Sequence, residues 1–499
     1  MNNMCDFIYA KPESVGIKSK NIHRYIELLE EANLCTHCLI IMRHGKIISE
    51  NYWEPFHKDF LHRQYSVTKS FVSLAIGFLE QDGMIDIDLP VSRYFPEELK
   101  NQPDENMKNQ TNRHMQMMTT AKTNENWFEA RCEDRVRFYF ENSLDETRPA
   151  GTVFQYDSTG SFVLGALVER ITGKELMTYL REKFLDKIGF PKEAYMLKCP
   201  GGHSWGDSGL VCKATDLLRT TQFVMNNGRW NGEQLLNREY ITKATSKQTD
   251  NNIMGVNTYR TQGYGYQFWR AYDNSFLFNG MGDQLAICVP DTDIIMVINS
   301  DNQGNIHSRK TIVDNFFDLI VRRAVDGGIA ESHEDTDKLE DYAATLKLFA
   351  VKGESYNAIQ EKCSGVTYNM NDNPMGITKI RLCFTGDKGV FCYTNAQGDK
   401  EIPFGMGHNE FSEFPQEGYS DEIGSQKGTR LYKCAASGAW VSDYQLLIKV
   451  QIIDTYFGYL NIGIGFTEDN KIGVCMTKAA EDFLNEYQGF AGGTKQTDI

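Results

Sequence analysis

The sequence lacks the features that mark membrane-spanning and disulfide-rich proteins. No run approaches the roughly 18 apolar residues that a membrane-spanning helix needs. The first eight residues have neither the basic start nor the apolar stretch of a secretion signal. The twelve cysteines are few and scattered for a chain of 499 residues, which in a reducing compartment is typical of buried thiols. We therefore expect a cytoplasmic protein without a disulfide framework.

Basic residues are also in deficit. The chain has 52 Lys and Arg against 67 Asp and Glu, a net charge of −15. An acidic surface repels phosphate backbones and anionic membrane surfaces, so we expect neither nucleic acid nor membrane as a partner. Hydrophobic residues make up 41% and charged residues 24%, which is ordinary for a globular protein. The length suggests two or three domains, at about 150 residues per domain.

Residues 1–330 have the pattern of a mixed α/β domain. Apolar runs separated by turns predict β-hairpins near 39–48 and 276–298. Between them, the pattern predicts a buried helix over 67–79, closed by Gly83, and a second over 162–171, ended by Gly173. Hairpins at both ends of this region suggest one antiparallel sheet assembled from the two ends, with helices packed on it. The predicted fold class is therefore mixed α/β, and of the α+β type because its sheet is expected to be antiparallel.

A change of pattern divides the chain after residue 330. Residues 331–345 are strongly acidic, and we interpret them as a solvated linker or the start of an exposed helix. Residues 346–499 contain short runs in which apolar and polar residues alternate, for example Ile448, Val450 and Ile452. This period of two predicts a small antiparallel β domain, either a barrel or a sandwich.

Ser66 and Lys69 are the first candidate catalytic pair. They form a Ser-x-x-Lys motif at the start of the predicted buried helix, and residues three apart share one helix face. The positive end of the helix dipole stabilises developing negative charge there. An uncharged lysine amine can then accept the serine proton, which would make Ser66 a nucleophile without a histidine. The alternative is a serine that caps the helix beside a lysine that extends to solvent.

Two further segments carry polar groups that could line a cleft. Tyr156 and Ser158 lie in a polar turn before the second apolar helix; the alternative is a packed tyrosine with a helix cap. The segment 279–284, Asn-Gly-Met-Gly-Asp-Gln, connects two predicted strands. Its glycines allow the backbone to approach a ligand and to direct N–H groups at it. The alternative there is an ordinary hairpin turn.

At these three segments the chain resembles the serine hydrolases of the β-lactamase and penicillin-binding-protein superfamily, in the branch similar to class C β-lactamases and family VIII esterases. The order of motifs agrees: Ser-x-x-Lys, then Tyr-x-Ser, then a glycine-containing strand segment. Surrounding stretches are similar as well: Arg43-His44-Gly45-Lys46, Pro149-Ala150-Gly151-Thr152, Gly206-Asp207-Ser208-Gly209-Leu210 and Val289-Pro290-Asp291. The resemblance covers about residues 10–320 and implies an antiparallel sheet flanked by helices, with a helical subdomain.

The resemblance also implies roles for the residues. Ser66 would be the acylated nucleophile, and Lys69 and Tyr156 would share the proton transfers. Ser158 would orient Lys69 or the substrate amide. The backbone N–H groups of Ser66 and Gln284 would form an oxyanion hole, worth about 3 kcal/mol per donor.

One departure from the family pattern concerns the third motif. It should begin with Lys, His or Trp, but here it begins with Met281. Gly280 precedes this methionine, and Gly282 and Asp283 follow it. In relatives a lysine at this position helps to bind a substrate carboxylate, which methionine cannot do. Asp283 also brings a negative charge there. We therefore expect neutral ester or amide substrates to be preferred over penicillins and D-Ala-D-Ala peptides.

The sequence therefore predicts a serine hydrolase that acts on a small ester or amide, with a transacylase as a close variant. The alternative from another class is a catalytically silent protein whose cleft only binds a ligand. No cofactor or metal is implied, and the oligomeric state stays open. We expect the β-rich domain to shape the cleft without supplying catalytic groups; the alternative is a domain that only supports the catalytic one.

Two other motifs are weaker candidates. Gly202-His203-Ser204-Trp205-Gly206 matches the nucleophile-elbow pattern, but glycines on both sides indicate a loop instead of the strand and helix that an elbow needs. Cys35 and Cys38 have the spacing of half a zinc site, but no second cysteine pair at ligand spacing follows, so we interpret them as structural thiols.

Overall fold

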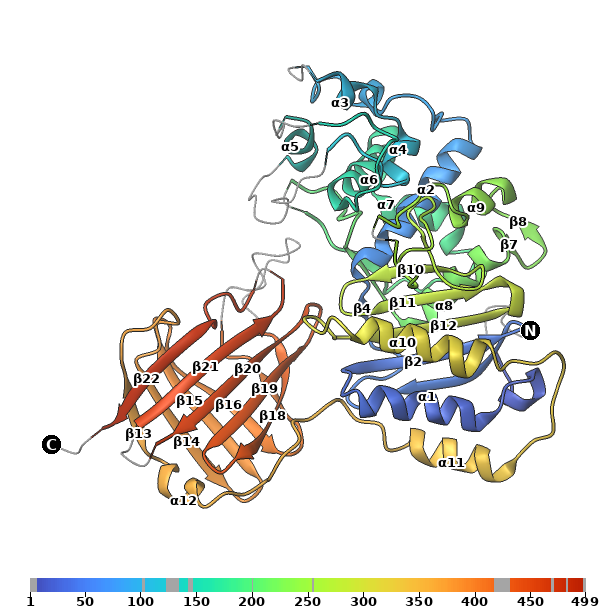
Figure 1. Ribbon diagram of the computed structural model, residues 1–499. Helices are drawn as coiled ribbons and strands as arrows, with labels where there is room; N and C mark the ends of the chain where they lie inside the picture. The colour runs from blue at the N-terminus through green and yellow to red at the C-terminus, as the bar shows by residue number, and fades with distance from the viewer. Residues whose placement is uncertain are drawn as a thin grey trace. The chain divides into compact units, whose positions relative to one another are not determined.

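The protein is described as a computed structural model that covers residues 7–100, 104–122, 134–141, 147–199, 201–253, 255–416, 431–467, 471–481 and 483–496. The chain divides into two compact units, Met1–Lys347 and Leu348–Ile499. Figure 1 shows the first unit with helices around a sheet and the second as a body built almost entirely of strands. Each unit is described separately below.

The first unit is centred on a seven-stranded sheet assembled from both ends of its sequence. The hairpin of β2 and β3 pairs with the later strands through β12, which lies antiparallel to β2 with Met296 opposite Ile41. Every neighbouring pair is antiparallel except β1 with β3. The predicted joining of the two hairpins is thereby confirmed. In spatial order the strands are β1 (Ile8–Tyr9), β3 (Lys46–Tyr52), β2 (Thr36–Arg43), β12 (Ile294–Ser300), β11 (Gln284–Val289), β10 (Phe276–Gly280) and β9 (Trp269–Arg270).

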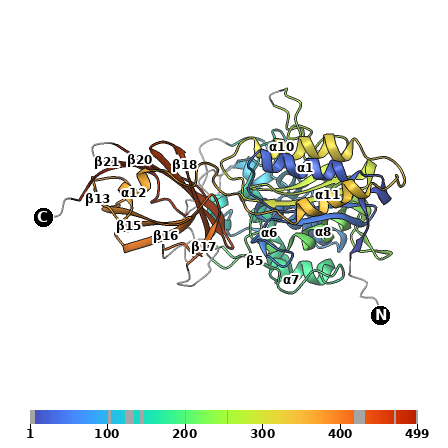
Figure 2. The ribbon, with the colours of Figure 1, turned by 90° about the horizontal axis from the view of Figure 1, so that it is seen from below.

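Helices cover both faces of this sheet. In Figure 2, α1 (Ser19–Glu31), α10 (Ser308–Phe316) and α11 (His333–Ala343) lie on one face, and α8 (Ala214–Met225) lies on the other. The core on the first face joins side chains such as Ile26 of α1 and Phe316 of α10 to Leu39 and Ile287 of the sheet. All four are fully buried, so this apolar layer fixes the sheet that carries the third candidate motif.

The segment between the hairpins forms a mainly helical region. The predicted buried helices are α2 (Thr68–Gln81) and α6 (Ser158–Thr172), which pack against each other. Gly173 ends α6 in the left-handed conformation, with φ 66°, which glycine adopts without steric cost. The other elements here are α3 (Glu105–Asn109), α4 (Asn112–Gln116), α5 (Arg135–Glu141), α7 (Leu176–Leu180), α9 (Arg238–Thr245), β4 (His62–Arg63), β5 (Tyr195–Met196), β6 (Leu210–Cys212), β7 (Arg229–Trp230) and β8 (Glu233–Gln234).

The acidic segment after residue 330 begins a helix, which is the second of the two interpretations that the sequence allowed, and it is not a solvated linker. It forms α11, whose first turn is capped by the Ser332 side chain. Thr336 and Leu339 are buried where α11 packs on α1, while most of its acidic residues are exposed. Two residues three apart are enough to give the helix an apolar face. The first unit therefore extends to Lys347 and includes this helix.

The second unit is a closed β-barrel. Nine strands form the ring, because β16 pairs parallel with β18 and so joins the two ends of the sheet, and β17 adds to β18 outside the ring. The alternating residues 448, 450 and 452 all point into the core, as the period of two predicts. The elements are α12 (Ile359–Cys363), β13 (Thr367–Met370), β14 (Lys379–Thr385), β15 (Lys388–Asn395), β16 (Gly398–Met406), β17 (Glu410–Glu413), β18 (Lys433–Ser442), β19 (Gln445–Ile453), β20 (Phe457–Phe466), β21 (Lys471–Ala479) and β22 (Gly489–Lys495).

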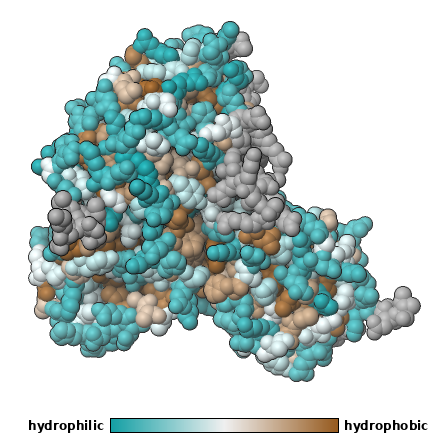
Figure 3. Space-filling model, turned by 180° about the vertical axis from the view of Figure 1, so that it is seen from behind, coloured by the Kyte–Doolittle hydropathy of each residue, from teal (hydrophilic) through white to brown (hydrophobic). Residues whose placement is uncertain are grey.

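The surface of the protein is mostly hydrophilic on the face that Figure 3 draws. On the face shown in Figure 3, hydrophilic residues cover most of each unit, and apolar residues appear as patches between them. Among the helices that the structure describes, none has the length and apolar character to cross a membrane.

Candidate active site

Ser66 lies on a short 3₁₀ turn, Tyr65–Val67, that leads directly into α2. The preceding Tyr65 has φ 47°, a left-handed conformation that is unfavourable for a bulky residue and that is common at functional sites. Packing holds it there: the Arg63 guanidinium lies 4.3 Å from the Tyr65 ring centroid, and the Thr68 hydroxyl donates to the Tyr65 carbonyl at 2.6 Å. The turn therefore presents Ser66 at the start of the buried helix.

The Lys69 amine contacts the Ser66 hydroxyl directly. Nζ donates to Ser66 Oγ at 2.8 Å and to the backbone carbonyl of Asp207 at 2.8 Å. Lys69 is 1% exposed, whereas Ser66 is half-buried. The predicted side-by-side arrangement on one helix face is present, so the Ser-x-x-Lys motif has the geometry for proton exchange between the two groups.

Tyr156 lies beside the same amine. Lys69 Nζ is 5.1 Å from the centroid of the Tyr156 ring, and that ring stacks on Trp269 at a centroid distance of 5.5 Å. Ser158 is the first residue of α6, after Asp157, whose side chain caps the helix by accepting from the Gly160 N–H at 3.1 Å. Between these described side chains, neither the Tyr156 nor the Ser158 hydroxyl hydrogen-bonds to Lys69.

The third motif forms the turn between β10 and β11. At Gly280 a Cβ atom would lie 2.4 Å from the Gln64 carbonyl oxygen, so only glycine lets β10 approach the turn that carries Ser66. Gly282 and Asp283 have φ 72° and 70°. The Gln284 side chain is fully buried and donates to the Met281 carbonyl at 3.1 Å, so it holds the backbone of the turn in place.

The negative charge of Asp283 is buried and paired with a cation. Its side chain is 3% exposed and accepts from Arg309 Nε at 2.8 Å. Arg309 also donates from Nη2 to the Gly280 carbonyl at 2.9 Å. The argument that Asp283 repels a substrate carboxylate therefore needs correction, because its charge is turned into the protein and neutralised by a cation from α10.

These segments enclose a cleft of about 420 Å³. Its wall includes Ser66 and Tyr156 from the helical side and the turn 280–283 from the sheet side. Residues far along the sequence complete it: Arg260, Trp269, Asn279, Asn302, Gln303, Gly304, Asn305, Ile306, Ser308 and Arg309. A nucleophile with its proton partner thus opens into a cavity of a size that fits a small substrate.

Several of these residues escaped the sequence analysis. The aromatic run at 264–269 could have drawn attention to Trp269. Nothing in the sequence links Arg309 to Asp283, because they are 26 residues apart. Asp207 lies in a stretch that resembles the family, but its contact with Lys69 runs through its backbone carbonyl, which any residue could supply.

The two weaker candidates have structural roles. The Ser204 N–H donates to Glu169 at 3.2 Å, and Glu169 also bonds to His203 at 2.7 Å. Ser204 is 3% exposed and lies in a loop bridge, as predicted, and not between a strand and a helix. Cys35 and Cys38 are both buried, as expected for structural thiols.

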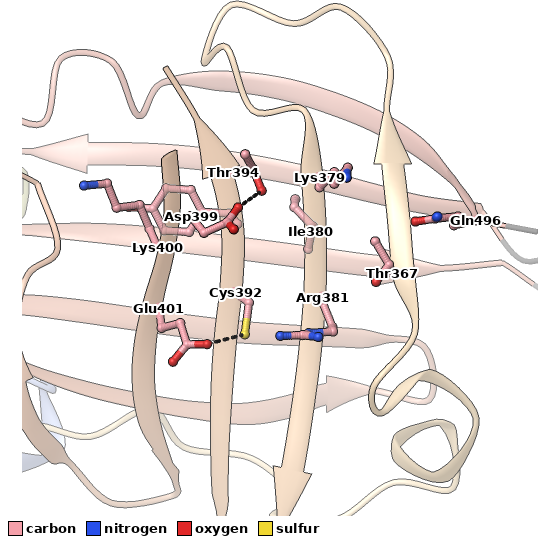
Figure 4. A pocket seen from close by; sticks show the side chains of 11 residues that line it. Thr367, Lys379, Ile380, Arg381, Cys392, Thr394, Asp399, Lys400, Glu401 and Gln496 are labelled. Atoms are coloured by element: carbon pink, nitrogen blue, oxygen red, sulfur yellow. Dashed lines mark hydrogen bonds between the residues drawn. The ribbon is translucent and has the colours of Figure 1, made fainter. Parts of the chain in front are cut away.

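The barrel has a hollow of its own, of about 280 Å³. Figure 4 shows it over β13 to β16, where two of its carboxylates accept hydrogen bonds, one from a hydroxyl and one from a thiol. Thr394 donates to Asp399 at 2.6 Å, and the Cys392 thiol lies 3.7 Å from Glu401. Within the described barrel residues, this hollow contains no pairing of a serine with a lysine or tyrosine like that at Ser66.

Comparison with known proteins agrees with the class of fold described above. The sequence model of the Beta-lactamase family matches residues 37–315, and the chain belongs to that family. This range includes Ser66, Lys69, Tyr156 and the whole 280–284 turn.

Individual relatives extend this finding. The 6-aminohexanoate-dimer hydrolase of Paenarthrobacter ureafaciens is 25% identical over 292 residues, which cover 54% of this chain and 73% of that protein. A solved structure from Bacillus anthracis, named as a candidate 6-aminohexanoate-dimer hydrolase, has a TM-score of 0.52 at 21% identity and covers 63% of this chain and 87% of its own. EstCE1, a hydrolase with promiscuous acyltransferase activity, has a TM-score of 0.50 at 14% identity and covers 60% of this chain and 98% of its own. At such identities the two structures establish the fold alone.

Proposed function

We propose that this chain is a serine hydrolase that forms an acyl-enzyme on Ser66 and cleaves small esters or amides. The observation that carries the proposal is the 2.8 Å contact between Lys69 Nζ and Ser66 Oγ at the start of α2, on the wall of a cleft of about 420 Å³. A nucleophile and a proton acceptor in direct contact are the minimum that covalent acyl transfer requires.

The proposed reaction has two steps. Ser66 Oγ attacks the substrate carbonyl carbon, and its proton passes to Lys69 or Tyr156. The same groups then protonate the leaving alcohol or amine as the C–O or C–N bond breaks. Water attacks the resulting ester on Ser66 and releases the acid. The backbone N–H groups of Ser66 and Gln284 would stabilise the oxyanion in both steps, and an alcohol or amine in place of water would give transacylation.

The names of the relatives support both substrate classes. An amide hydrolase is suggested by the 6-aminohexanoate-dimer hydrolase, and ester cleavage with acyl transfer is suggested by EstCE1. Met281 lines the cleft at the position where lactam-binding relatives have a cationic or aromatic residue. That substitution favours linear substrates over penicillins. It also motivates the alternative of a silent ligand-binding protein.

A serine-directed probe separates these alternatives. We expect a fluorophosphonate to label the wild-type protein, and p-nitrophenyl acetate to be hydrolysed. Both activities should be lost in Ser66→Ala, which removes only the hydroxyl. Ser204→Ala, in a buried loop outside the cleft, is the matched control and should retain both. Undiminished activity in a folded Ser66→Ala protein, or absence of labelling in the wild type, would overturn the proposal.

A further inference from the structure

The cleft beside Ser66 carries a net positive charge. Its charged lining residues are Arg260, Asp283 and Arg309. Asp283 and Arg309 form an ion pair with an N–O distance of 2.8 Å, so their charges cancel. One positive charge is left, on Arg260. Because the chain as a whole has a net charge of −15, this local excess is opposite to the overall electrostatics and points to an anionic ligand.

Arg260 is held at the cleft by its neighbours while its side chain stays available. Tyr259 is 7% exposed and belongs to the core under the sheet. The Arg260 carbonyl accepts from Asn251 Nδ2 at 2.8 Å, and its N–H donates to the Thr258 hydroxyl at 3.3 Å. The residue is exposed, and within the described part of the chain its guanidinium has no hydrogen bond or ion pair.

The second arginine cannot play the same part without breaking existing contacts. Arg309 uses Nε for Asp283 and Nη2 for the Gly280 carbonyl. Removing it from Asp283 would leave a carboxylate that is 3% exposed without its cation, which is strongly unfavourable. Arg260 has no such competing partner, so a ligand can take both arms of its guanidinium.

We propose that Arg260 binds a carboxylate on the substrate and so makes carboxylate-bearing linear esters or amides the preferred class. The inference rests on the proposed function of Ser66. Arg260 would supply, from a different loop, the cation that the third motif lacks at Met281. A planar guanidinium matches a carboxylate in a two-point hydrogen-bonded geometry. Ser308, the first residue of the nine-residue helix α10, also lines the cleft, and the positive end of the helix dipole adds to the attraction.

The test uses substrate pairs that differ only in charge. The first pair places the charge on the acyl side: the p-nitrophenyl half-ester of adipic acid against p-nitrophenyl hexanoate. The second places it on the leaving group: 4-acetoxybenzoate against its methyl ester. In at least one pair, wild type should prefer the anion in kcat/KM. Arg260→Gln should lose about 10-fold or more on that anion and change less than about 2-fold on its neutral partner. Arg260→Lys should retain part of the preference.

Controls make each outcome decisive. Arg238→Gln removes the same charge from an exposed position on α9 outside the cleft, and it should leave the preference unchanged. In a Ser66→Ala background, hexanoate should bind more tightly than hexanamide, and Arg260→Gln should abolish the difference; this readout needs no turnover. Equal effects of Arg260→Gln on anionic and neutral substrates, or a preference that survives it, would overturn the inference. Ester hydrolysis that persists in Ser66→Ala would instead overturn the proposed function.

Discussion

Replacing Asp207 with asparagine should change how the stability of the first unit depends on pH. Asp207 is fully buried, and neither carboxyl oxygen bonds to another residue in the described part of the chain. Burial raises the pKa of this carboxyl from 3.8 to about 6, while the charges of Lys69 and Arg135 oppose the rise. The folded protein therefore keeps a proton that the unfolded chain has already lost at the same pH.

The size of the effect follows from the two pKa values. A separation between 3.8 and about 6 corresponds to about 3 kcal/mol at 1.36 kcal/mol per pH unit. The sign is set by the raised pKa in the folded state: stability is lost as pH rises from about 4 through about 6. Asparagine does not titrate. The free energy of unfolding of Asp207→Asn, relative to wild type, should therefore rise by about 2 kcal/mol between pH 4.5 and pH 7.5.

Urea unfolding at both pH values measures this difference. Tryptophan fluorescence reports mainly on the first unit, because five of the six tryptophans precede Lys347. Titrating groups distant from Asp207 are common to the two proteins, so their contributions cancel. Asp326→Asn, at an exposed position, controls for removal of a carboxylate. A stability difference between Asp207→Asn and wild type that does not vary with pH, or that falls as pH rises, would refute the reasoning.

Two further predictions concern packing. Gly280→Ala places a Cβ 2.4 Å from the Gln64 carbonyl and should displace β10 from the Ser66 turn. Since a displacement of about 1 Å can lower a rate about 100-fold, kcat/KM for p-nitrophenyl acetate should fall by about that factor. Gly473→Ala, where nothing lies within 4 Å, should not change it; normal activity in Gly280→Ala would contradict the account. The second prediction compares the free energies of unfolding of two fragments, one ending at residue 347 and one at residue 333. The longer fragment should be more stable by about 3–6 kcal/mol, because Leu339 and Leu346 belong to the core and burial of each contributes about 1.5–3 kcal/mol. Equal urea midpoints with equal m-values for the two fragments would show that α11 does not stabilise the unit.

Local patterns were sufficient to predict much of the fold. The hairpins near 39–48 and 276–298 and the helix from Thr68 to Gln81 are long apolar segments with clear turn residues, and their type follows from their own sequence. The strands after residue 440 alternate regularly, so they could be predicted one by one. The helix α11 was harder to identify because Thr336 and Leu339 are its only buried residues among many charges.

The site was predictable only where the chemistry is local. Ser66 and Lys69 are three residues apart on one helix, so their contact follows from helical geometry. The ion pair of Asp283 and Arg309 and the place of Arg260 on the cleft depend on the packing of distant segments, which no local pattern encodes. A charge inferred from sequence alone, such as that of Asp283, can therefore be neutralised by an unforeseen partner.

The most direct test of the central claim is the mass of the intact protein during turnover. The protein is mixed with a panel of p-nitrophenyl esters and β-lactams, quenched in acid within seconds, and its mass is measured. Our account predicts, with at least one p-nitrophenyl ester, a mass increase equal to that of the acyl group less the hydrogen it replaces, located on the peptide that contains Ser66 and absent in Ser66→Ala. Ester hydrolysis without any adduct on that peptide, or with the adduct on another residue, would contradict it.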